Sequence, residues 1–477
     1  MRLVVVSNRV PVPPAEGPGG LAVALKDALG HGGGVWLGWN GLERTGRAAT
    51  PHEVERNGVT FATVPLMPED VGNFYAGYAN SVLWPGFHGL LHAVQYRPEF
   101  WNGYQSVNGY FADLAARVVR PGDVIWVHDY HFVPLAAELR RRGVTERIGF
   151  FLHIPFPPLD VLRALPGHRR LLEAMLAYDL VGFQTAADAE NFAGALAGAL
   201  GARIDAAAGV AELTGRRARF GAFPIGIDVD ATARTALAQR GSRIGQRITR
   251  TLRGRKLVIG ADRLDYTKGL PQRFDAYERL LAERHGELDD RVVYAQIAAP
   301  SRETVPAYRE LASALEAQAG RINARFGNLC WTPLKLVAQP VPRDALLGYL
   351  SLADVALVTS LRDGMNLVAK EFLAAQTAED PGVLVLSNLT GAAEELADAA
   401  LVVNPYDSDA TAQAIHRALT MPFAERRQRW ALGLATLRDN TARIWRARFL
   451  DALTGSRRPQ RVVPAEPGLA VLDVARG

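Results

Sequence analysis

Short, almost uninterrupted apolar runs alternate with longer helix-like segments along this chain, and this alternation restricts the possible folds more than any other feature. Parallel strands that are buried on both faces are apolar throughout. The order of the runs therefore predicts an α/β fold with open parallel sheets and helices on both faces. The predicted strands are Leu3–Val6, Val124–Val127, Ile148–Leu152, Leu180–Phe183, Lys256–Gly260, Val292–Ile297, Val355–Val358, Val383–Leu386 and Leu401–Val403.

Helix-like segments fill the spaces between these runs. They include Leu135–Arg142, Arg273–Arg284, Ala307–Ala319, Ala410–Leu419 and a long amphipathic run around Arg426–Leu453. The alternation is interrupted over Val229–Arg255, which is basic and helical or irregular. A chain of 477 residues is long enough for two α/β domains, each with its own core. We therefore expect one domain over residues 1–240, a second over 241–455, and a disordered tail over 456–477.

The composition is that of a globular protein, with 48% hydrophobic and 22% charged residues. The one cysteine, Cys330, cannot form an internal disulfide, so nothing requires an oxidising compartment. The apolar run Leu3–Val6 is too short for a signal peptide or a membrane span. The net charge of +5 is spread along the chain and forms no basic face with interleaved aromatic residues. We expect a cytosolic protein that binds neither membrane nor nucleic acid and has a mildly positive cleft for phosphorylated substrates.

Polar residues directly after the apolar runs are the candidate site residues, because ligands bind beyond the carboxyl ends of the strands in open α/β sheets. Arg9 ends the first strand, where a buried arginine would need an anionic partner. Gly19 and Gly20 precede a helix-like start at Leu21. Such glycines let backbone N–H groups approach a phosphate, although a flexible loop is an equal alternative. The end of the first strand thus indicates an anion site.

The strand Val124–Val127 is followed by His128-Asp129-Tyr130-His131, and His153 follows the next predicted strand. The Asp129 carboxylate could accept hydrogen bonds from sugar hydroxyls. Prolines after His153 would hold its imidazole in place. A metal site formed by the histidines is the alternative, but no acidic or cysteine ligand is spaced to complete the set. For His131 and His153 purely structural hydrogen bonding is a further alternative.

Two cations follow the strand Lys256–Gly260. Arg263 and Lys268, five residues apart, could clamp a diphosphate, the arginine as a fork and the lysine as a point charge. Lys268 is one of five lysines in the whole chain. The alternative is a surface salt bridge with Asp262 or Asp265. We favour the diphosphate clamp.

The segment Asp363–Glu371 contains the sharpest motif. A strand ends at Val358, a turn follows, and a helix is expected to begin near Asn366. The first N–H groups of that helix could hold a phosphate, Glu371 the hydroxyls of a ribose, and Asp363 the hydroxyls of a hexose. The alternative, acidic residues that only stabilise a helix N-terminus, leaves the Gly-Met-Asn turn unexplained.

Together these segments resemble the trehalose-6-phosphate synthase family of retaining glycosyltransferases, which have two Rossmann-like domains facing each other across a cleft, the GT-B fold. The match runs from about residue 3 to about residue 450. Its most specific strings are VVVSNR (4–9), LWPGFH (83–88), WVHDYH (126–131), GFFLHIPFP (149–157), RLDYTKGLPQRF (263–274) and LRDGMNLVAKE (361–371). The resemblance implies transfer of glucose from a nucleoside-diphosphate glucose, with UDP-glucose favoured, to glucose 6-phosphate. It also implies a last helix that packs back on the first domain, and a homo-oligomer.

The resemblance implies a role for each matched residue. Glucose 6-phosphate would be bound by Arg9, Tyr75, Asp129 and Arg302. The nucleotide sugar would be bound by Gly19, Gly20, Arg263, Lys268, Val341, Asp363, Gly364, Met365, Asn366, Leu367, Val368, Ala369, Lys370 and Glu371. Catalytic contacts would come from Arg263, Lys268, Asp129, His153 and Asp363, and selection of the α-anomeric acceptor from Trp84 and Ile154. Because the cations and a helix N-terminus would stabilise the leaving diphosphate, no metal or other cofactor is expected.

Two departures from the family pattern leave details open. The loop between Arg9 and Gly19 is short and rich in proline, and Val341 stands where phenylalanine is common. The loop is therefore expected to close over the donor differently, and Val341 leaves the choice among uridine, guanosine and adenosine open. One alternative activity is that of a glucosylglycerol-phosphate synthase with glycerol 3-phosphate as acceptor. Another is a silent homologue that binds sugar phosphate and regulates a partner. No GxGxxG sequence follows the first strand, which excludes a classical dinucleotide-binding dehydrogenase.

Overall fold

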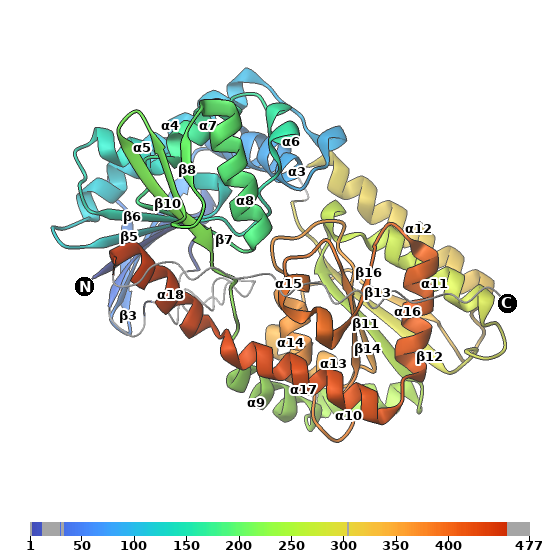
Figure 1. The fold of residues 1–477 in the computed structure, drawn as a ribbon. Coiled ribbons are helices and arrows are strands. Elements are labelled where there is room, and N and C mark those ends of the chain that lie inside the picture. Colours follow the sequence, from blue (N-terminus) through green and yellow to red (C-terminus); the bar gives the residue numbers. More distant parts are fainter. Residues whose placement is uncertain (1, 12–28, 30–32, 303–304, 456–477) are drawn as a thin grey trace.

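The computed structural model describes residues 2–11, 29, 33–302 and 305–455, and within them two sheets are flanked by helices (Figure 1). This arrangement confirms the predicted α/β fold. We call residues 2–222 the first half, 223–228 the crossover and 229–455 the second half. Gly19, Gly20, the helix start at Leu21 and the tail from residue 456 lie outside the described residues.

The sheet of the first half is mixed. Its ten described strands lie in the order β3-β4-β2-β1-β5-β6-β7-β10-β9-β8. The pairs from β4 to β10 are parallel, whereas β3, β8 and β9 pair with their neighbours in antiparallel fashion. The strands are β1 (Leu3–Arg9), β2 (Gly34–Glu43), β3 (His52–Arg56), β4 (Val59–Leu66), β5 (Val124–His128), β6 (Arg147–Phe151), β7 (Leu180–Phe183), β8 (Arg203–Asp205), β9 (Val210–Leu213) and β10 (Arg216–Ala222).

The sheet of the second half is parallel from edge to edge. In the described part of the chain its six strands lie in the order β13-β12-β11-β14-β15-β16. They are β11 (Lys256–Arg263), β12 (Val292–Ala299), β13 (Leu334–Val337), β14 (Val355–Val358), β15 (Val383–Ser387) and β16 (Ala400–Val403). All nine predicted strands are confirmed, while β2, β3, β4, β8, β9, β10 and β13 were not predicted.

Helices cover both sheets, as the alternation predicts. In the first half they are α2 (Pro68–Asp70), the π-helical η1 (Val71–Leu83), α3 (Trp84–Phe87), η2 (Leu91–Ala93), α4 (Pro98–Val118), η3 (Tyr130–Phe132), α5 (Leu135–Arg141), α6 (Leu159–Arg163), α7 (His168–Met175), α8 (Ala186–Ala195) and η4 (Leu196–Leu200). In the second half they are α9 (Val229–Arg240), α10 (Arg243–Leu252), η5 (Tyr266–Lys268), α11 (Leu270–Glu283), α12 (Pro306–Phe326), α13 (Arg343–Ser351), α14 (Leu367–Ala375), α15 (Ala393–Leu396), η6 (Ala397–Ala399), α16 (Ser408–Thr420), α17 (Phe423–Asp439) and α18 (Ala442–Thr454).

The predicted single helix around residues 426–453 is wrong, because the chain breaks between α17 and α18. Asn440 has a non-helical backbone and donates its side-chain amide to the carbonyl of Pro224 in the crossover, at 2.8 Å. Thr441 then caps α18 by accepting the N–H of Ile444. Figure 1 shows the result: α17 lies beside the second half, whereas α18 crosses to the first. There Phe449 packs on Trp126 of β5, with ring centres 4.9 Å apart.

Packing also bears on the division into domains. Helix α9 contacts α13 and α14 of the second half. We therefore infer that the boundary lies in the crossover, before α9, rather than at residue 240. One buried apolar cluster includes Phe223, Ile225 and Ile227 of the crossover together with residues of both halves.

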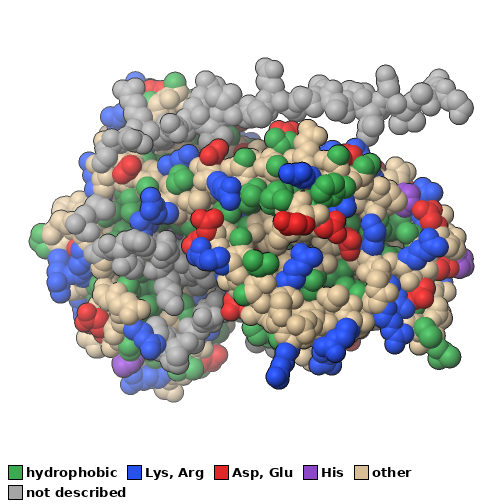
Figure 2. Space-filling view, turned by 90° about the horizontal axis from the view of Figure 1, so that it is seen from below, with side chains coloured by type: hydrophobic (Ala, Val, Ile, Leu, Met, Phe, Trp, Pro, Cys, Tyr) green, Lys and Arg blue, Asp and Glu red, His purple; other side chains and the backbone are tan. Residues whose placement is uncertain are grey.

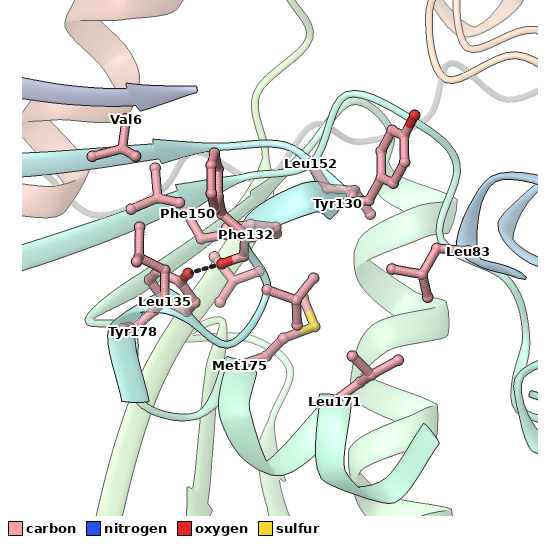
Figure 3. Packing of buried hydrophobic residues seen from close by; sticks show 14 of the residues in the cluster. Val6, Leu83, Tyr130, Phe132, Leu135, Phe150, Leu152, Leu171, Met175 and Tyr178 are labelled. Carbon is pink, nitrogen blue, oxygen red and sulfur yellow. Dashed lines mark hydrogen bonds between the residues drawn. The ribbon is translucent and has the colours of Figure 1, made fainter. Parts of the chain in front are cut away.

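A second buried cluster fills the helix-covered face of the first sheet. Figure 3 shows part of it, including Val6, Leu135 and Phe150. The hydroxyl of buried Tyr178 donates to the carbonyl of Phe132 at 2.6 Å. Tyr130 belongs to the same cluster, but its hydroxyl points away from the other labelled residues. The buried cluster therefore supports Tyr130, whose hydroxyl is directed away from it.

The surface agrees with the dispersed charge of the sequence. On the face drawn in Figure 2, lysine and arginine side chains are scattered among acidic and other side chains. Among the described helices, none is long and apolar enough to span a membrane.

Candidate active site

The carboxyl ends of the two sheets face each other, and side chains of the two halves meet there. The indole N–H of Trp84 in α3 lies 3.4 Å from Oδ1 of Asp265, which follows β11. Arg302, which follows β12, donates to the hydroxyl of Tyr130 in η3 at 3.0 Å. Strand ends from both halves thus form one junction, as the rule for open α/β sheets requires.

Arg302 is enclosed at this junction, with a side chain only 5% exposed. Its guanidinium carbon lies 3.9 Å from the centre of the Trp84 ring. The guanidinium donates to the hydroxyl of Tyr308 at 2.6 Å and to Oδ2 of Asp265 at 3.3 Å. The backbone of Arg302 has φ of 51°, a left-handed conformation that few residues with a side chain adopt. A permanently charged group is therefore fixed where the halves meet.

Lys268 and Asp363 form a second ionic group, a salt bridge of 2.5 Å. Lys268 ends η5, and Asp363 lies in the loop after β14. Burial alone would raise the pKa of Asp363, but Lys268 holds that pKa below its ordinary value. The alternative of a surface salt bridge to Asp262 or Asp265 is wrong, because Lys268 pairs with Asp363 and Asp262 pairs with Arg273 at 2.7 Å.

Asn366 caps helix α14 from a left-handed backbone, with φ of 86°. Its Oδ1 accepts the N–H groups of Val368 at 3.1 Å and Ala369 at 3.4 Å, and its Nδ2 donates to Asp363 at 3.0 Å. The helix therefore starts where the motif predicts. A phosphate at this helix end would replace the Asn366 side chain as acceptor of these N–H groups.

The backbones of the two halves also touch, at Gly364. A Cβ at this position would lie 2.1 Å from the carbonyl oxygen of His153, and one on Gly391 would lie 1.9 Å from the carbonyl oxygen of Gly364. Only glycine permits such an approach. The Gly-Met-Asn turn is thereby explained: it brings the loop that carries Asp363 against the loop that carries His153.

His153 is held in one tautomer by its neighbours. The backbone N–H of Ile225 donates to Oε1 of Gln184 at 3.0 Å, so the amide nitrogen of Gln184 faces Nδ1 of His153, 3.4 Å away. The His153 proton therefore lies on Nε2, which donates to Nδ1 of His128 at 3.0 Å. Burial lowers the pKa of His153 to about 3 and also lowers the pKa of His128. His153 is thus suited to hydrogen bonding and not to proton transfer near neutral pH.

Asp129 has a strained backbone, with φ of 74°. Its Oδ1 accepts the backbone N–H of His153 at 3.2 Å. Burial raises the pKa of Asp129 to about 6, although this N–H and the charge of Arg302 act in the opposite direction. A carboxylate that is buried with few partners is suited to accept hydrogen bonds from hydroxyl groups.

Arg9 and Tyr75 lie on an aromatic wall of the first half. The guanidinium carbon of Arg9 lies 4.6 Å from the centre of the Trp39 ring, and Arg9 is exposed rather than buried. Tyr75 contacts the edge of Trp39 and stacks on His131 with ring centres 6.0 Å apart. Arg9 is therefore a cation with an accessible guanidinium on an aromatic base.

Glu371 and Lys370 are neighbours on α14 but point to different partners. Glu371 binds Arg343 at 3.0 Å, and burial raises its pKa although Arg343 opposes the rise. Lys370 is fully buried and donates to the carbonyl of Ile225 at 2.7 Å and to Glu395 at 2.5 Å. The Lys370 side chain thus ties α14 to the crossover, and only its backbone belongs to the helix start.

The other predicted residues lie around these groups. Arg263 lies with its guanidinium carbon 5.7 Å from the centre of the Trp84 ring. Ile154, Met365 and Ala369 are buried, and Leu367, Val368 and Val341 are half-buried against the shared apolar cluster. Among the described residues, no three histidine, cysteine, aspartate or glutamate side chains are grouped so that they could hold a metal ion.

Sequence reasoning missed four residues that organise the site: Tyr130, Gln184, Asp265 and Arg343. Tyr130 and Asp265 lie inside the motifs WVHDYH and RLDYTK, so their positions carried a signal. Gln184 directly follows the predicted strand Leu180–Phe183, where the strand-end rule could have found it. Arg343 is separated from its partner Glu371 by 28 residues, and no local pattern indicates it.

Comparisons with known proteins find relatives that match nearly the whole chain. A model of glycosyltransferase family 20 matches residues 6–455. A trehalose-6-phosphate synthase of Citrobacter koseri is 46% identical over 452 residues, which are 94% of each chain. The UDP-forming α,α-trehalose-phosphate synthase of Burkholderia xenovorans, solved in complex with glucose 6-phosphate, has a TM-score of 0.91 at 45% identity and covers 95% of this chain and 100% of its own. The E. coli protein bound to UDP-2-fluoroglucose has a TM-score of 0.90 at 43% identity, with 97% and 100% covered.

Proposed function

The chain belongs to glycosyltransferase family 20, and from this premise we propose that it transfers glucose from UDP-glucose to glucose 6-phosphate, releasing UDP and forming α,α-trehalose 6-phosphate. One observation carries the proposal. Arg302 of the second half donates to the Tyr130 hydroxyl of the first half, and Arg263 lies over the Trp84 ring. The pair Lys268–Asp363 precedes Gly364, whose backbone touches His153 of the first half at the same junction. This is where two phosphorylated sugars would have to meet.

The donor would lie on the second half. Arg263 and Lys268 bind its diphosphate, together with the N–H groups at the start of α14. Glu371, which Arg343 holds in place, accepts hydrogen bonds from the ribose hydroxyls. Asp363 and His153 contact the hexose, and the segment from Gly364 to Lys370 and Val341 surround the nucleotide. Gly19 and Gly20 stay predictions from the sequence.

The acceptor would lie between the halves. Its phosphate is bound by Arg302 and Arg9, with Tyr75 beside them on the aromatic wall. Asp129 accepts hydrogen bonds from its hydroxyls. Trp84 and Ile154 enclose its anomeric carbon. This leaves the anomeric hydroxyl directed at the donor hexose.

The reaction needs no enzyme nucleophile in this arrangement. The bond between the anomeric carbon of the donor and the diphosphate oxygen breaks, and both electrons leave with UDP. Arg263 and Lys268 stabilise the negative charge that develops on the diphosphate, which is electrostatic preorganisation. The acceptor's anomeric oxygen attacks the same face, and its proton passes to a phosphate oxygen of the leaving group. The configuration of the donor carbon is therefore retained.

A product assay tests the function. The protein is incubated with glucose 6-phosphate and with UDP-, GDP- or ADP-glucose in turn, and the product is identified by NMR. We expect α,α-trehalose 6-phosphate, formed fastest from UDP-glucose. Parallel reactions with glycerol 3-phosphate test the glucosylglycerol-phosphate alternative. Turnover with glycerol 3-phosphate alone would overturn the assignment, and no turnover with any pair would favour a regulatory homologue. The cytosolic location and the homo-oligomer stay predictions.

A further inference from the structure

Asp265 is a buried carboxylate on which both halves of the molecule converge. Its side chain is 0% exposed. Oδ2 accepts hydrogen bonds from Arg302 at 3.3 Å and from the hydroxyl of Tyr308 at 3.2 Å. Oδ1 accepts one from the indole N–H of Trp84, in the other half, at 3.4 Å. One carboxylate thus joins the arginine and the tryptophan that the acceptor would contact.

The same carboxylate also orders the turn η5. Its Oδ1 accepts the backbone N–H and the hydroxyl of Thr267, each at 3.0 Å. This turn ends in Lys268. Burial opposes ionisation of Asp265, but Arg302, Arg263 and Lys268 together hold its pKa below the ordinary value. Asp265 is therefore a negative charge close to three cations, of which Arg302 is its ion-pair partner.

The orientation of Arg302 follows from this contact. One terminal nitrogen of its guanidinium is directed at Asp265 and Tyr308, and the other at Tyr130. The guanidinium carbon lies over the Trp84 ring, 3.9 Å from its centre. An unrestrained arginine side chain has many rotamers, and fixing one costs entropy on each binding event. A preformed orientation removes that cost from acceptor binding.

We propose that Asp265 is a positioning residue of the acceptor site, which binds Arg302 of the second half and Trp84 of the first half at once and so fixes the place where the acceptor's phosphate and anomeric hydroxyl bind. This role rests on the proposed function. Asp265 does not contact either substrate in the arrangement described above. It acts through Arg302.

The variant Asp265→Asn tests the role with little change of volume. One carboxylate oxygen faces two N–H or O–H donors of Thr267, and the other faces the donors of Arg302 and Tyr308. The amide nitrogen of asparagine is itself a donor, so one of these groups must lose its acceptor. If Thr267 keeps the oxygen, the amide nitrogen displaces Arg302 from Trp84. We expect the KM for glucose 6-phosphate to rise about 10- to 100-fold and the KM for UDP-glucose to change less than about threefold.

Asp262→Asn is the matched control. Asp262 lies three residues earlier and pairs with another buried arginine, Arg273, at 2.7 Å. Its loss should lower the melting temperature and leave the ratio of the two KM values unchanged. A double-mutant cycle with Arg302→Ala adds a second readout: in the Arg302→Ala background, Asp265→Asn should weaken acceptor binding less than about twofold.

Calorimetry of glucose 6-phosphate binding in the presence of UDP separates this proposal from the proposed function, because it needs no turnover. If Asp265→Asn weakens both substrates equally, or adds its full effect in the Arg302→Ala background, the positioning role is overturned. If the wild type binds glucose 6-phosphate and the variant does not, yet no trehalose 6-phosphate is formed, the role stands and the proposed function fails. A wild type that does not bind glucose 6-phosphate overturns both.

Discussion

The first half of the molecule lines the junction mainly with rings and hydrogen-bonding groups, whereas the second half supplies ion pairs. Trp84, Tyr130 and the neutral His153 belong to the first half. The pairs Lys268–Asp363 and Arg302–Asp265 belong to the second. A hexose presents hydroxyls and C–H faces, while a leaving diphosphate presents concentrated charge. The comparison indicates that the first half is suited to the hexose and the second half to the leaving diphosphate. Variants in the two halves should therefore have different effects on binding and on catalysis.

The largest effect is expected for Lys268→Ala, which removes a cation from the second half. The developing charge on the diphosphate loses a point charge held in a buried site, and Asp363 loses its partner at 2.5 Å. We expect kcat to fall about 10³-fold, with the fold retained by circular dichroism. The reaction is followed by UDP release.

Lys335→Ala is the control for this variant, because Lys335 is an exposed lysine of the same half. Its kcat should match the wild type. Normal turnover in Lys268→Ala would show that Lys268 of the second half does not stabilise the leaving diphosphate.

The next effect concerns α18, which belongs to the second half in sequence but packs on the first. Phe449 is fully buried, and its ring contacts Trp126, Phe151 and Phe223. A Cβ on Gly182 would lie 2.7 Å from it, so the sheet leaves room for this ring. Phe449→Ala should lower the free energy of unfolding by about 3–5 kcal/mol, measured by urea denaturation.

Phe423→Ala provides the comparison for Phe449, since Phe423 is 45% exposed at the start of α17. Its loss should cost less than about 1 kcal/mol. Equal losses for both variants would mean that α18 does not support the first half.

Central strands of the two sheets are easier to predict from the sequence than strands near the sheet edges. Central strands such as β5 and β14 are buried on both faces and were predicted from unbroken apolar runs. The unpredicted strands lie mostly toward sheet edges, as β3, β8 and β13 do. These three strands have only three to five residues. β2 is an exception, because it lies between β4 and β1 and its residues 35–39 are buried. An edge strand needs no apolar outer face, so the pattern that reveals a central strand is missing there.

For the site, strand-end positions could be predicted from the sequence, whereas side-chain directions could not. Lys370 and Glu371 adjoin in the motif, yet successive residues on a helix point about 100° apart. One side chain therefore reaches the crossover, while the other reaches Arg343. The tautomer of His153 depends on Gln184 and on the backbone of Ile225, contacts that only the folded chain brings together.

Arg302→Ala tests whether a residue of the second half binds the acceptor, glucose 6-phosphate. Arg302 crosses the junction to Trp84 and Tyr130, so its loss should weaken acceptor binding more than donor binding. We expect the KM for glucose 6-phosphate to rise about 10- to 100-fold and that for UDP-glucose to change only a few-fold. Initial rates with each substrate varied in turn give both values. An equal rise in both would place Arg302 with the donor.

The smallest effect is a difference in pH dependence between one carboxylate of each half. The pKa of Asp129 is raised to about 6 by burial, so the stability that its neutral form contributes is present near pH 4 and is lost as the pH rises through about 6. Asp129→Asn cannot ionise, and because asparagine matches aspartate in size and branching, the backbone strain at φ of 74° should be similar in the two proteins. Its melting temperature relative to the wild type should therefore rise by roughly 1–3 °C between pH 4.5 and pH 8.

Asp363 behaves in the opposite way: its pKa is held low beside Lys268, so its contribution is present above its ordinary pKa and is lost as the pH falls. Asp363→Asn should accordingly destabilise the protein more at pH 8 than at about pH 3, with most of the change below the ordinary pKa of aspartate. If the two variants shift in the same direction with pH, the contrast between an isolated carboxylate in the first half and a paired one in the second is wrong.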